Sequence, residues 1–565
     1  MTASPSTTSC RLQWAGRATR LAWPLACVAA LACAARGEQP PPVVQVIRDE
    51  ASRRNQDPAG RPLPLAGHWN RGQQPDGFGP DYQLELIRKG CHLLPWFAFP
   101  NPVAGDEAVA KALPYYEVAM KQWAAWRLPI TLIGTQWEAT LYGESRFRDL
   151  PPEKNPNVID SDGKVLKKLD PLGPVEPWAE VGRYWTDTPL MRKLQERYPD
   201  PPLVIFVSNN EAADLRWHQV EQSQRYLRKY GLGRDDDFKR RVVGDAWIER
   251  YRALQKGMRE GLAAEAWRRN VRFVGYGAFG PPHLGRWDGW PEYSLHSKNR
   301  ISPEPLMWDG GSPSYYTHNW NPSTDFRVWS PQIEGMNWVF MLEEAWRLNP
   351  DFWFEFSTWD GNSVEGKASS KPKKKDAPPP KSKVEEYRRQ GQTFTPERYK
   401  GFCQFGMWLL TPRLMREFRS STDTRTRVGA YYEALVGAVD AVHASPVLTR
   451  FWRESALVPN RAEKHPYQTG IPEEYAGCDR WFLLDTSLDP PRPWTYETAL
   501  PVFALARVIG KPGSREWLVY AHSPPEPRQG VTVTVPDYGP VQVDVAVGGS
   551  FYVVTEQNKE TTPVR

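Results

Sequence analysis

Short apolar runs alternate with helical stretches along most of this chain, and that alternation limits its fold more than any other feature. From residue 61 onward we identify eight candidate strands, most of them near-continuous in apolar residues. Such runs are typical of strands buried on both faces, and helices between them indicate parallel strands joined by crossovers. The runs are Pro62–Trp69, Cys91–Phe99, Ile130–Trp137, Leu203–Ser208, Val271–Ala278, Ser314–His318, Phe352–Ser357 and Phe402–Leu410.

Helical patterns separate these runs. The clearest are Asp106–Trp126, Asp187–Tyr198, Ala246–Asn270 and Gln332–Leu348, and another helix near Val428–His443 follows the eighth run. Eight strand–helix units predict an α/β fold, a (β/α)8 TIM barrel over residues 61–445. A doubly wound open sheet is the structural alternative.

The remaining segments differ from the barrel in composition. Residues 36–60 are polar and Pro-rich and predict a linker, residues 446–475 a connector, and residues 476–565 a C-terminal antiparallel β-sandwich, in which Val531–Val535 and Val541–Val547 alternate at period two. Two insertions interrupt the barrel. Residues 212–245 are charged and helical and could cover one rim as a lid, whereas the Lys/Pro/Ser-rich residues 363–392 predict a disordered loop.

The first 35 residues have the order of a secretory signal peptide. Arg11, Arg17 and Arg20 precede the short apolar run Leu21–Leu31, and small residues follow up to Ala35. This order predicts export to the periplasm or the extracellular space, and the run is too short to be a mature membrane span. Cys33 leaves a lipid anchor as an alternative, although Ala30 stands where a lipobox prefers Leu.

Charge and cysteine content exclude several classes of protein. The net charge is +6, but three Arg in the first 35 residues, and seven Lys with one Asp in residues 367–383, leave the remaining chain near −3. A nucleic-acid-binding protein distributes basic residues over its folded surface, so we expect no nucleic-acid partner. After residue 35 only Cys91, Cys403 and Cys478 remain, which predicts no disulfide scaffold. Nine His without a His-x-His after the first strand predict no metal site and no cofactor.

Two of the predicted strands end in glutamates. The fourth is followed by Asn209-Asn210-Glu211, and the seventh carries Glu355 inside an aromatic run. Barrel enzymes place catalytic groups at the carboxyl ends of their strands, and strands four and seven lie on different sides of such a barrel. Glycoside hydrolysis requires two carboxyl groups across the scissile bond, so Glu211 and Glu355 are the candidate catalytic pair. Alternatively, Glu211 is a first-turn acid of the next helix, and Glu355 is paired with Arg413.

This pattern resembles the retaining glycoside hydrolases of clan A, in which Asn-Glu ends strand four and Glu ends strand seven. The layout Ile159-Asp160-Ser161-Asp162-Gly163, Trp185-Thr186-Asp187-Thr188-Pro189 and Arg197-Tyr198-Pro199-Asp200-Pro201 before Asn210-Glu211 is similar to the β-galactosidase-type family 42. The resemblance covers roughly residues 61–445 and implies that Glu211 is the acid/base, Asn210 a substrate ligand and Glu355 the nucleophile. The cysteine metal cluster of family 42 is missing here, and the rims of strands one and eight match poorly.

Further residues at the predicted strand ends are candidate sugar contacts, because the chain holds 26 Trp and aromatic faces stack on sugars. Each of these residues could equally serve in packing, and Glu138 and Asp360 are also the main rivals for a catalytic role. The candidates are Trp69, Asn70, Gln136, Trp137, Glu138, His283, Tyr316, His318, Trp320, Trp359, Asp360 and Trp408.

Together these features predict an exported enzyme that hydrolyses β-glycosidic bonds of an oligo- or polysaccharide by a retaining double displacement. The alternative is a non-catalytic carbohydrate-binding protein that has the same barrel and the same aromatic residues. In both cases the expected partner is a carbohydrate.

Overall fold

A computed structural model describes residues 42–55, 65–69, 80–91, 93–102, 105–209, 215–277, 304–313, 342, 345–346, 348–357, 395–408, 410–417, 429–457, 483–484, 502–523, 526–535 and 537–564. Its centre is a sheet of parallel strands in the order β1-β10-β9-β8-β7-β6-β3-β2, which closes into a barrel because β2 also pairs with β1. The strands are β1 (Leu65–Trp69), β2 (Leu93–Ala98), β3 (Ile130–Thr135), β6 (Val204–Asn209), β7 (Val271–Gly277), β8 (Gly310–Pro313), β9 (Trp353–Ser357) and β10 (Leu414–Glu417).

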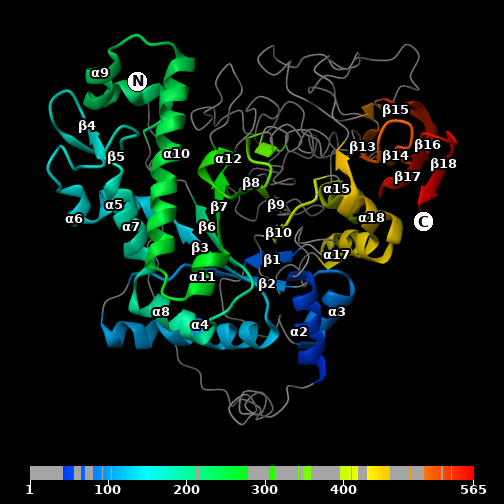
Figure 1. The fold of residues 1–565 in the computed structure, drawn as a ribbon, viewed down its shortest axis with the longest axis horizontal. Helices are drawn as coiled ribbons and strands as arrows, with labels where there is room; N and C mark the ends of the chain where they lie inside the picture. The colour runs from blue at the N-terminus through cyan, green and yellow to red at the C-terminus, as the bar shows by residue number, and fades with distance from the viewer. Residues whose placement is uncertain are drawn as a thin grey trace, which may run out of the picture.

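Helices follow these strands along the chain and lie around the sheet (Figure 1). They are α3 (Pro80–Arg88), α4 (Asp106–Trp126), α7 (Glu176–Thr186), α8 (Pro189–Arg197), α10 (Asp236–Gly261), α11 (Glu265–Asn270), α12 (Glu304–Met307), α15 (Pro396–Trp408) and α17 (Gly429–Ala444). The predicted α/β class is therefore confirmed.

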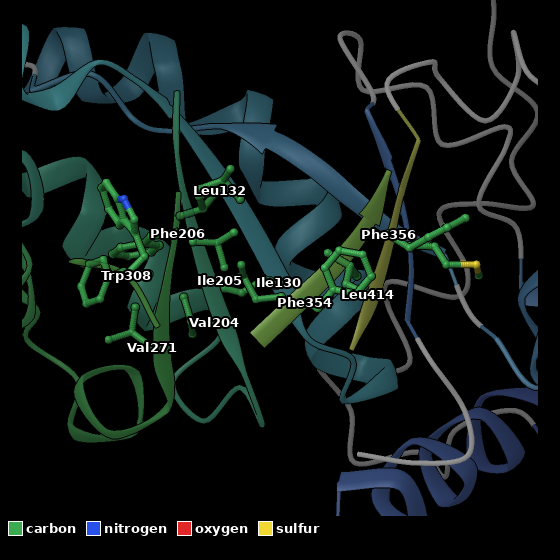
Figure 2. Close-up of a cluster of buried hydrophobic side chains, with 14 of the residues drawn as sticks. Ile130, Leu132, Val204, Ile205, Phe206, Val271, Trp308, Phe354, Phe356 and Leu414 are labelled. Atoms are coloured by element: carbon green, nitrogen blue, oxygen red, sulfur yellow. The ribbon is translucent and has the colours of Figure 1, made fainter. Parts of the chain in front are cut away.

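The core fills the space between strands and helices. Figure 2 shows part of it, where apolar side chains of β3, β6, β7, β9 and β10 gather together with Trp308. Phe206 on β6 and Phe273 on β7 are register partners and make an edge-to-face ring contact at 5.7 Å between centroids. Arg259 of α10 lies over the Phe273 ring, so this pair points outward from the barrel toward the helices.

One predicted strand is wrong, and another lies outside the described residues. Phe402–Trp408, most of one predicted strand, forms the C-terminal half of helix α15, and the eighth barrel strand is β10, at Leu414–Glu417. A continuous apolar run does not distinguish a buried helix from a buried strand, and α15 buries Phe402, Cys403 and Phe405 almost completely. The sixth strand is β8, Gly310–Pro313, just before the predicted Ser314–His318, which lies outside the described residues.

The predicted linker at residues 36–60 differs too. It contains helix α2 (Pro42–Asn55), whose Ile47 is fully buried in the main core. The predicted helix Ala246–Asn270 is divided into α10 and α11, with Leu262 to Ala264 between them. Residues 1–35 and the insertion 363–392 lie outside the described residues.

A segment with several helices and a short β-hairpin connects β3 to β6, and a second, helical segment connects β6 to β7 (Figure 1). The antiparallel pair β4–β5 and the helices of the second segment pack beside the long α10. The short elements are η2 (Trp137–Ala139), α5 (Thr140–Gly143), α6 (Ser145–Arg148), β4 (Asn157–Ile159), β5 (Val165–Leu169), η3 (Trp217–Gln222) and α9 (Gln224–Tyr230).

The C-terminal part forms separate antiparallel sheets next to α15, α17 and α18 (Figure 1). One sheet has the order β11-β13-β14-β17-β18 with β12 on β13, and the other is β15–β16. Alternate valines of β15 and β16, such as Val533 and Val543, share one core with Trp517 and Val519 of β14. The elements are α18 (Pro446–Glu454), β11 (Ala456–Leu457), β12 (Leu483–Leu484), β13 (Phe503–Ile509), β14 (Glu516–His522), β15 (Arg528–Val535), β16 (Gly539–Val545), β17 (Ser550–Thr555) and β18 (Thr561–Val564).

Within the described residues, no helix is both long enough and apolar enough to cross a bilayer.

Candidate active site

Glu355 is a carboxylate buried inside the barrel. Its neighbour Phe356 contacts Phe402 of α15 at 5.6 Å between ring centroids, so Phe356 points outward to the helix layer. Side chains alternate along a strand, and Glu355 therefore points to the opposite face, into the barrel interior. The residue has no exposed surface and lies two positions before the carboxyl end of β9.

Burying a carboxylate in the barrel interior is unfavourable unless ion pairs or hydrogen bonds compensate the cost, and buried carboxylates that persist are often found at functional sites. Glu355 on β9 is the register partner of Leu414 on β10, and its environment in the structure includes at least one further interaction. Arg413, the suggested ion-pair partner, donates its backbone N–H to the Phe354 carbonyl at 2.8 Å. Its guanidinium lies 5.9 Å from the centre of the Trp353 ring. The Arg413 guanidinium thus makes a cation–π contact with the Trp353 ring.

Strand β6 leads the chain to the other candidate carboxylate. It ends at Asn209, which pairs with Thr135 of β3 and Tyr276 of β7. In the strand order, two strands separate β6 from β9 on one side and four on the other, so the two carboxyl ends lie across the barrel mouth. Asn210 and Glu211 come next and lie outside the described residues, and so does the distance between the two carboxyl groups.

Glu138, a rival for the catalytic role, is directed elsewhere. It lies in η2 directly after β3 and is fully buried. The Tyr251 hydroxyl on α10 donates to Glu138 Oε1 at 3.4 Å. Because α10 packs on the outside of the barrel, this contact holds Glu138 on the helix side of the rim. The geometry therefore favours Glu355 over Glu138 as a group acting inside the barrel.

Trp137 is a packing residue in this structure, not an open surface for a sugar ring. It is fully buried, and its ring centroid is 5.2 Å from that of Phe99 and 6.5 Å from that of Phe206. Gly134 makes room for it, since a Cβ there would lie 2.0 Å from the indole. Gln136, by contrast, is half-buried and has a left-handed backbone (φ 54°). Non-glycine residues with this strain are concentrated at functional sites.

The other predicted contacts are only partly located. Trp69 is the last residue of β1, and Trp408 is the last residue of helix α15, so its predicted position on a strand is wrong. The described residues do not include the remaining candidates, which are Asn70, His283, Tyr316, His318, Trp320, Trp359 and Asp360. Within the part of the chain that the structure describes, no group of three or more His, Cys, Asp or Glu could hold a metal ion.

The motifs behind the family resemblance have structural roles. Asp160 to Gly163 form the turn between β4 and β5, where Asp160 Oδ1 accepts from the backbone N–H groups of Asp162 and Lys164 at 3.0 and 2.9 Å. Thr188 caps α8 by accepting from Met191 N at 3.1 Å. The Tyr198 hydroxyl donates to Leu128 O at 2.9 Å. These contacts fix the chain before β6 and contribute no reacting group.

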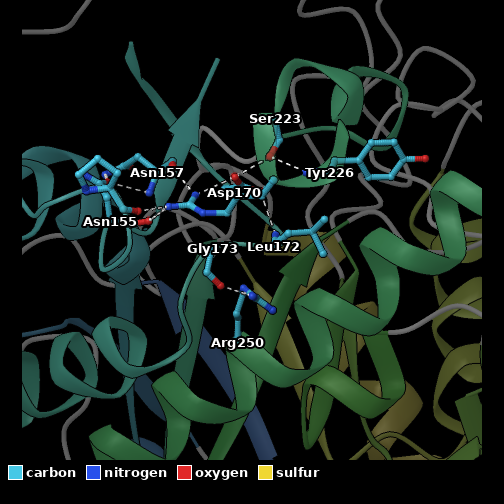
Figure 3. Close-up of polar contacts among 10 residues, drawn as sticks. Asn155, Asn157, Asp170, Leu172, Gly173, Ser223, Tyr226 and Arg250 are labelled. Carbon is cyan, nitrogen blue, oxygen red and sulfur yellow. Dashed lines mark hydrogen bonds and ion pairs between the residues drawn. The ribbon is translucent and has the colours of Figure 1, made fainter. Parts of the chain in front are cut away.

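A buried polar network, which no local motif in the sequence indicates, lies beside this hairpin (Figure 3). Asp170 has no exposed surface, and its Oδ2 accepts from Ser223 Oγ at 2.7 Å and from Arg225 at 2.9 Å. Arg225 also donates to the carbonyls of Pro152, Asn155 and Asn157. The partners lie up to 73 residues apart in sequence, which explains why no local motif indicated the network.

Comparison with solved structures finds a distant likeness to "The crystal structure of an agarase, AgWH50C", with a TM-score of 0.30 and 11% sequence identity. The alignment covers 70% of this chain and 62% of the agarase chain, so this chain spans less than two thirds of that structure. No protein-family model matches the sequence, and no curated protein matches it.

Proposed function

We propose that this protein is a retaining glycoside hydrolase built on a (β/α)8 TIM barrel, with Glu355 as nucleophile and Glu211 as acid/base. One observation carries the proposal, the fully buried Glu355 on the interior face of a closed ring of parallel strands. The end of β6 across the mouth, where the sequence continues as Asn210-Glu211, supports the second role. Glu138 is a weaker candidate for the catalytic role, because its hydrogen bond with Tyr251 holds it on the helix side of the barrel rim.

In the proposed reaction the Glu355 carboxylate attacks the anomeric carbon while Glu211 gives its proton to the departing glycosidic oxygen. The first product leaves, and a glycosyl ester with Glu355 remains. A water molecule then attacks the same carbon while Glu211 removes a proton from that water, and the ester bond to Glu355 breaks. Two displacements at one carbon retain its configuration. Asn210, next to the acid/base, is proposed to bind a hydroxyl of the same sugar.

Export and the C-terminal region belong to the same proposal. The basic start, short apolar run and small residues of residues 1–35 support secretion or export to the periplasm. The shared core of β14, β15 and β16 supports a β-sandwich packed beside the barrel. An extracellular polysaccharide is a substrate that suits both features.

A panel of neutral and acidic polysaccharides, assayed for new reducing ends, tests the proposal. The parent protein is expected to cleave at least one, and Glu355→Gln is expected to lose turnover while retaining sugar binding. Binding without turnover in the parent would instead support the non-catalytic carbohydrate-binding alternative. Equal turnover by parent and Glu355→Gln would remove Glu355 from the mechanism.

A further inference from the structure

The larger C-terminal sheet, β11-β13-β14-β17-β18, is buried on both faces along its strand β14. Leu518 and Tyr520 of β14, with Phe551 of β17, belong to the core that fills the barrel and its helices. Trp517 and Val519, which alternate with them, belong to a second core shared with β15 and β16. An antiparallel sheet that only lay beside the barrel would leave one face to water. This sheet instead completes the core of the barrel.

Helix α15 meets the C-terminal sheet through two glycines, one from each side of the contact. The Tyr520 hydroxyl donates to the Gly401 carbonyl on α15, and a Cβ at Gly401 would lie 2.8 Å from His522 Nδ1. From the sheet, a Cβ at Gly549 would lie 2.8 Å from Gln404 Oε1, about one turn further along the helix. Such close approach requires residues without a side chain. The sheet and the helix therefore have one fixed relative position.

A second face of α15 packs on β9, the strand that carries Glu355. Phe402 and Gly406 are four residues apart and share this face. The Phe402 ring contacts that of Phe356 at 5.6 Å between centroids, and a Cβ at Gly406 would overlap the Phe356 ring. Residues 401–406 are all buried. Helix α15 thus lies between the C-terminal sheet and β9.

This arrangement connects the sheet mechanically to the proposed nucleophile. Phe356 follows Glu355 directly, so a shift of the Phe356 ring also moves the backbone on which Glu355 is carried. Close-packed interiors have few voids and transmit strain. A misplacement of about 1 Å that originates far from the chemistry can lower turnover by about a hundredfold.

We propose that the C-terminal sheet positions the nucleophile Glu355. Tyr520 and Gly401 are its positioning residues, and they act through α15 and the Phe356 ring. The inference rests on the proposed function, which assigns the nucleophile. It makes the C-terminal sheet part of the catalytic unit, in contrast to a separable carbohydrate-binding module.

Hydrogen exchange measured by mass spectrometry tests the coupling without a substrate. Tyr520→Phe removes only the hydroxyl that binds α15 and should speed exchange in residues 353–357 of β9 about fivefold, the factor expected for one lost hydrogen bond. Tyr552→Phe is the matched control, because the Tyr552 hydroxyl donates to Asp544 O at 2.7 Å and packs with the second core. This control should leave β9 unchanged, and β3 and β6 are the internal reference.

Turnover shows whether the coupling reaches the reaction. With the polysaccharide of the panel that the parent cleaves, Tyr520→Phe is expected to lower kcat about tenfold and to leave KM within about twofold. It should also move the acidic limb of the pH profile by at least about half a pH unit. A partly unfolded variant would lower kcat equally at every pH. Gly401→Ala should act like Tyr520→Phe, and Gly437→Ala, with open space around its Cβ on α17, is its control.

The proposal is overturned if either the β9 exchange or the turnover of Tyr520→Phe equals that of Tyr552→Phe. Equal acceleration in β3, β6 and β9 also overturns it, because the effect is then not selective for the strand of Glu355. A change in KM alone assigns the effect to sugar binding and has the same consequence. A parent without hydrolase activity, or unchanged turnover in Glu355→Gln, refutes the proposed function, while exchange still decides whether the sheet fixes β9.

Discussion

Mild acid is expected to weaken the contact between β14 and α15 through the buried residue His522. A Cβ on Gly401 of α15 would lie 2.8 Å from His522 Nδ1, and the Tyr520 hydroxyl donates to the Gly401 carbonyl. Burial lowers the pKa of His522 from 6.5 to about 3. Between these values the unfolded chain binds a proton at His522 and the folded chain does not, so stability falls as the pH falls.

The size of this effect follows from the shift. Each pH unit between the two pKa values changes the free energy of unfolding by about 1.4 kcal/mol. With a folded pKa of about 3, the parent should therefore lose about 2 kcal/mol between pH 8 and pH 5 through this residue alone. Urea unfolding at both pH values, followed by tryptophan fluorescence, measures the loss.

A substitution assigns the loss to the histidine. His522→Gln is expected to be less stable at pH 8 but to lose about 2 kcal/mol less than the parent on acidification. His218→Gln, at an exposed position of η3, is the control and should follow the parent. If His522→Gln shows the same pH dependence as the parent, the linkage argument is refuted, whatever its absolute stability.

Three further predictions concern the framework. Arg225→Ala should destabilise the region between β4 and α9 by about 3 kcal/mol, because it leaves the carboxylate of Asp170 buried without this cation, and faster proteolysis there would reveal it. Gly257→Ala should cost about 1–3 kcal/mol in thermal unfolding, since its Cβ would lie 2.0 Å from the Ala179 carbonyl oxygen of the neighbouring helix. Gly437→Ala, with open space around its Cβ, should instead stabilise α17 by about 0.5–1 kcal/mol, and a lower melting temperature would contradict this.

The barrel could be predicted where strands are apolar and long. The runs at β3, β6 and β7 are nearly continuous in buried apolar residues, and this character together with the flanking helices indicates parallel strands. The sixth strand, Gly310–Pro313, consists of residues with low strand propensity, so its pairing with β7 and β9 comes from tertiary contacts. For Phe402–Leu410 the error lies in the pattern itself, because residues 401–406 of the helix are all buried and Gly406 fits against the Phe356 ring, so no polar face marks the helical period there.

The candidate site was predictable in part for similar reasons. The inward direction of Glu355 follows from strand alternation once the strand is recognised. Glu138 and Trp137 could not be separated from mouth residues by sequence, because their direction depends on Tyr251 and Phe99, which are distant along the chain. The hydrogen bonds from Lys168 to Gln219 and Gln222 likewise depend on how η3 folds back onto β5.

The hydrolysis rate of Glu355→Gln relative to the parent tests the central claim most directly. The measurement uses the best substrate of the panel and confirms by thermal unfolding that both proteins are folded. If Glu355 is the nucleophile, its replacement is expected to lower turnover by at least about a hundredfold, with retained sugar binding. A variant that folds and hydrolyses the substrate at the parental rate would contradict the assignment of Glu355 as the nucleophile.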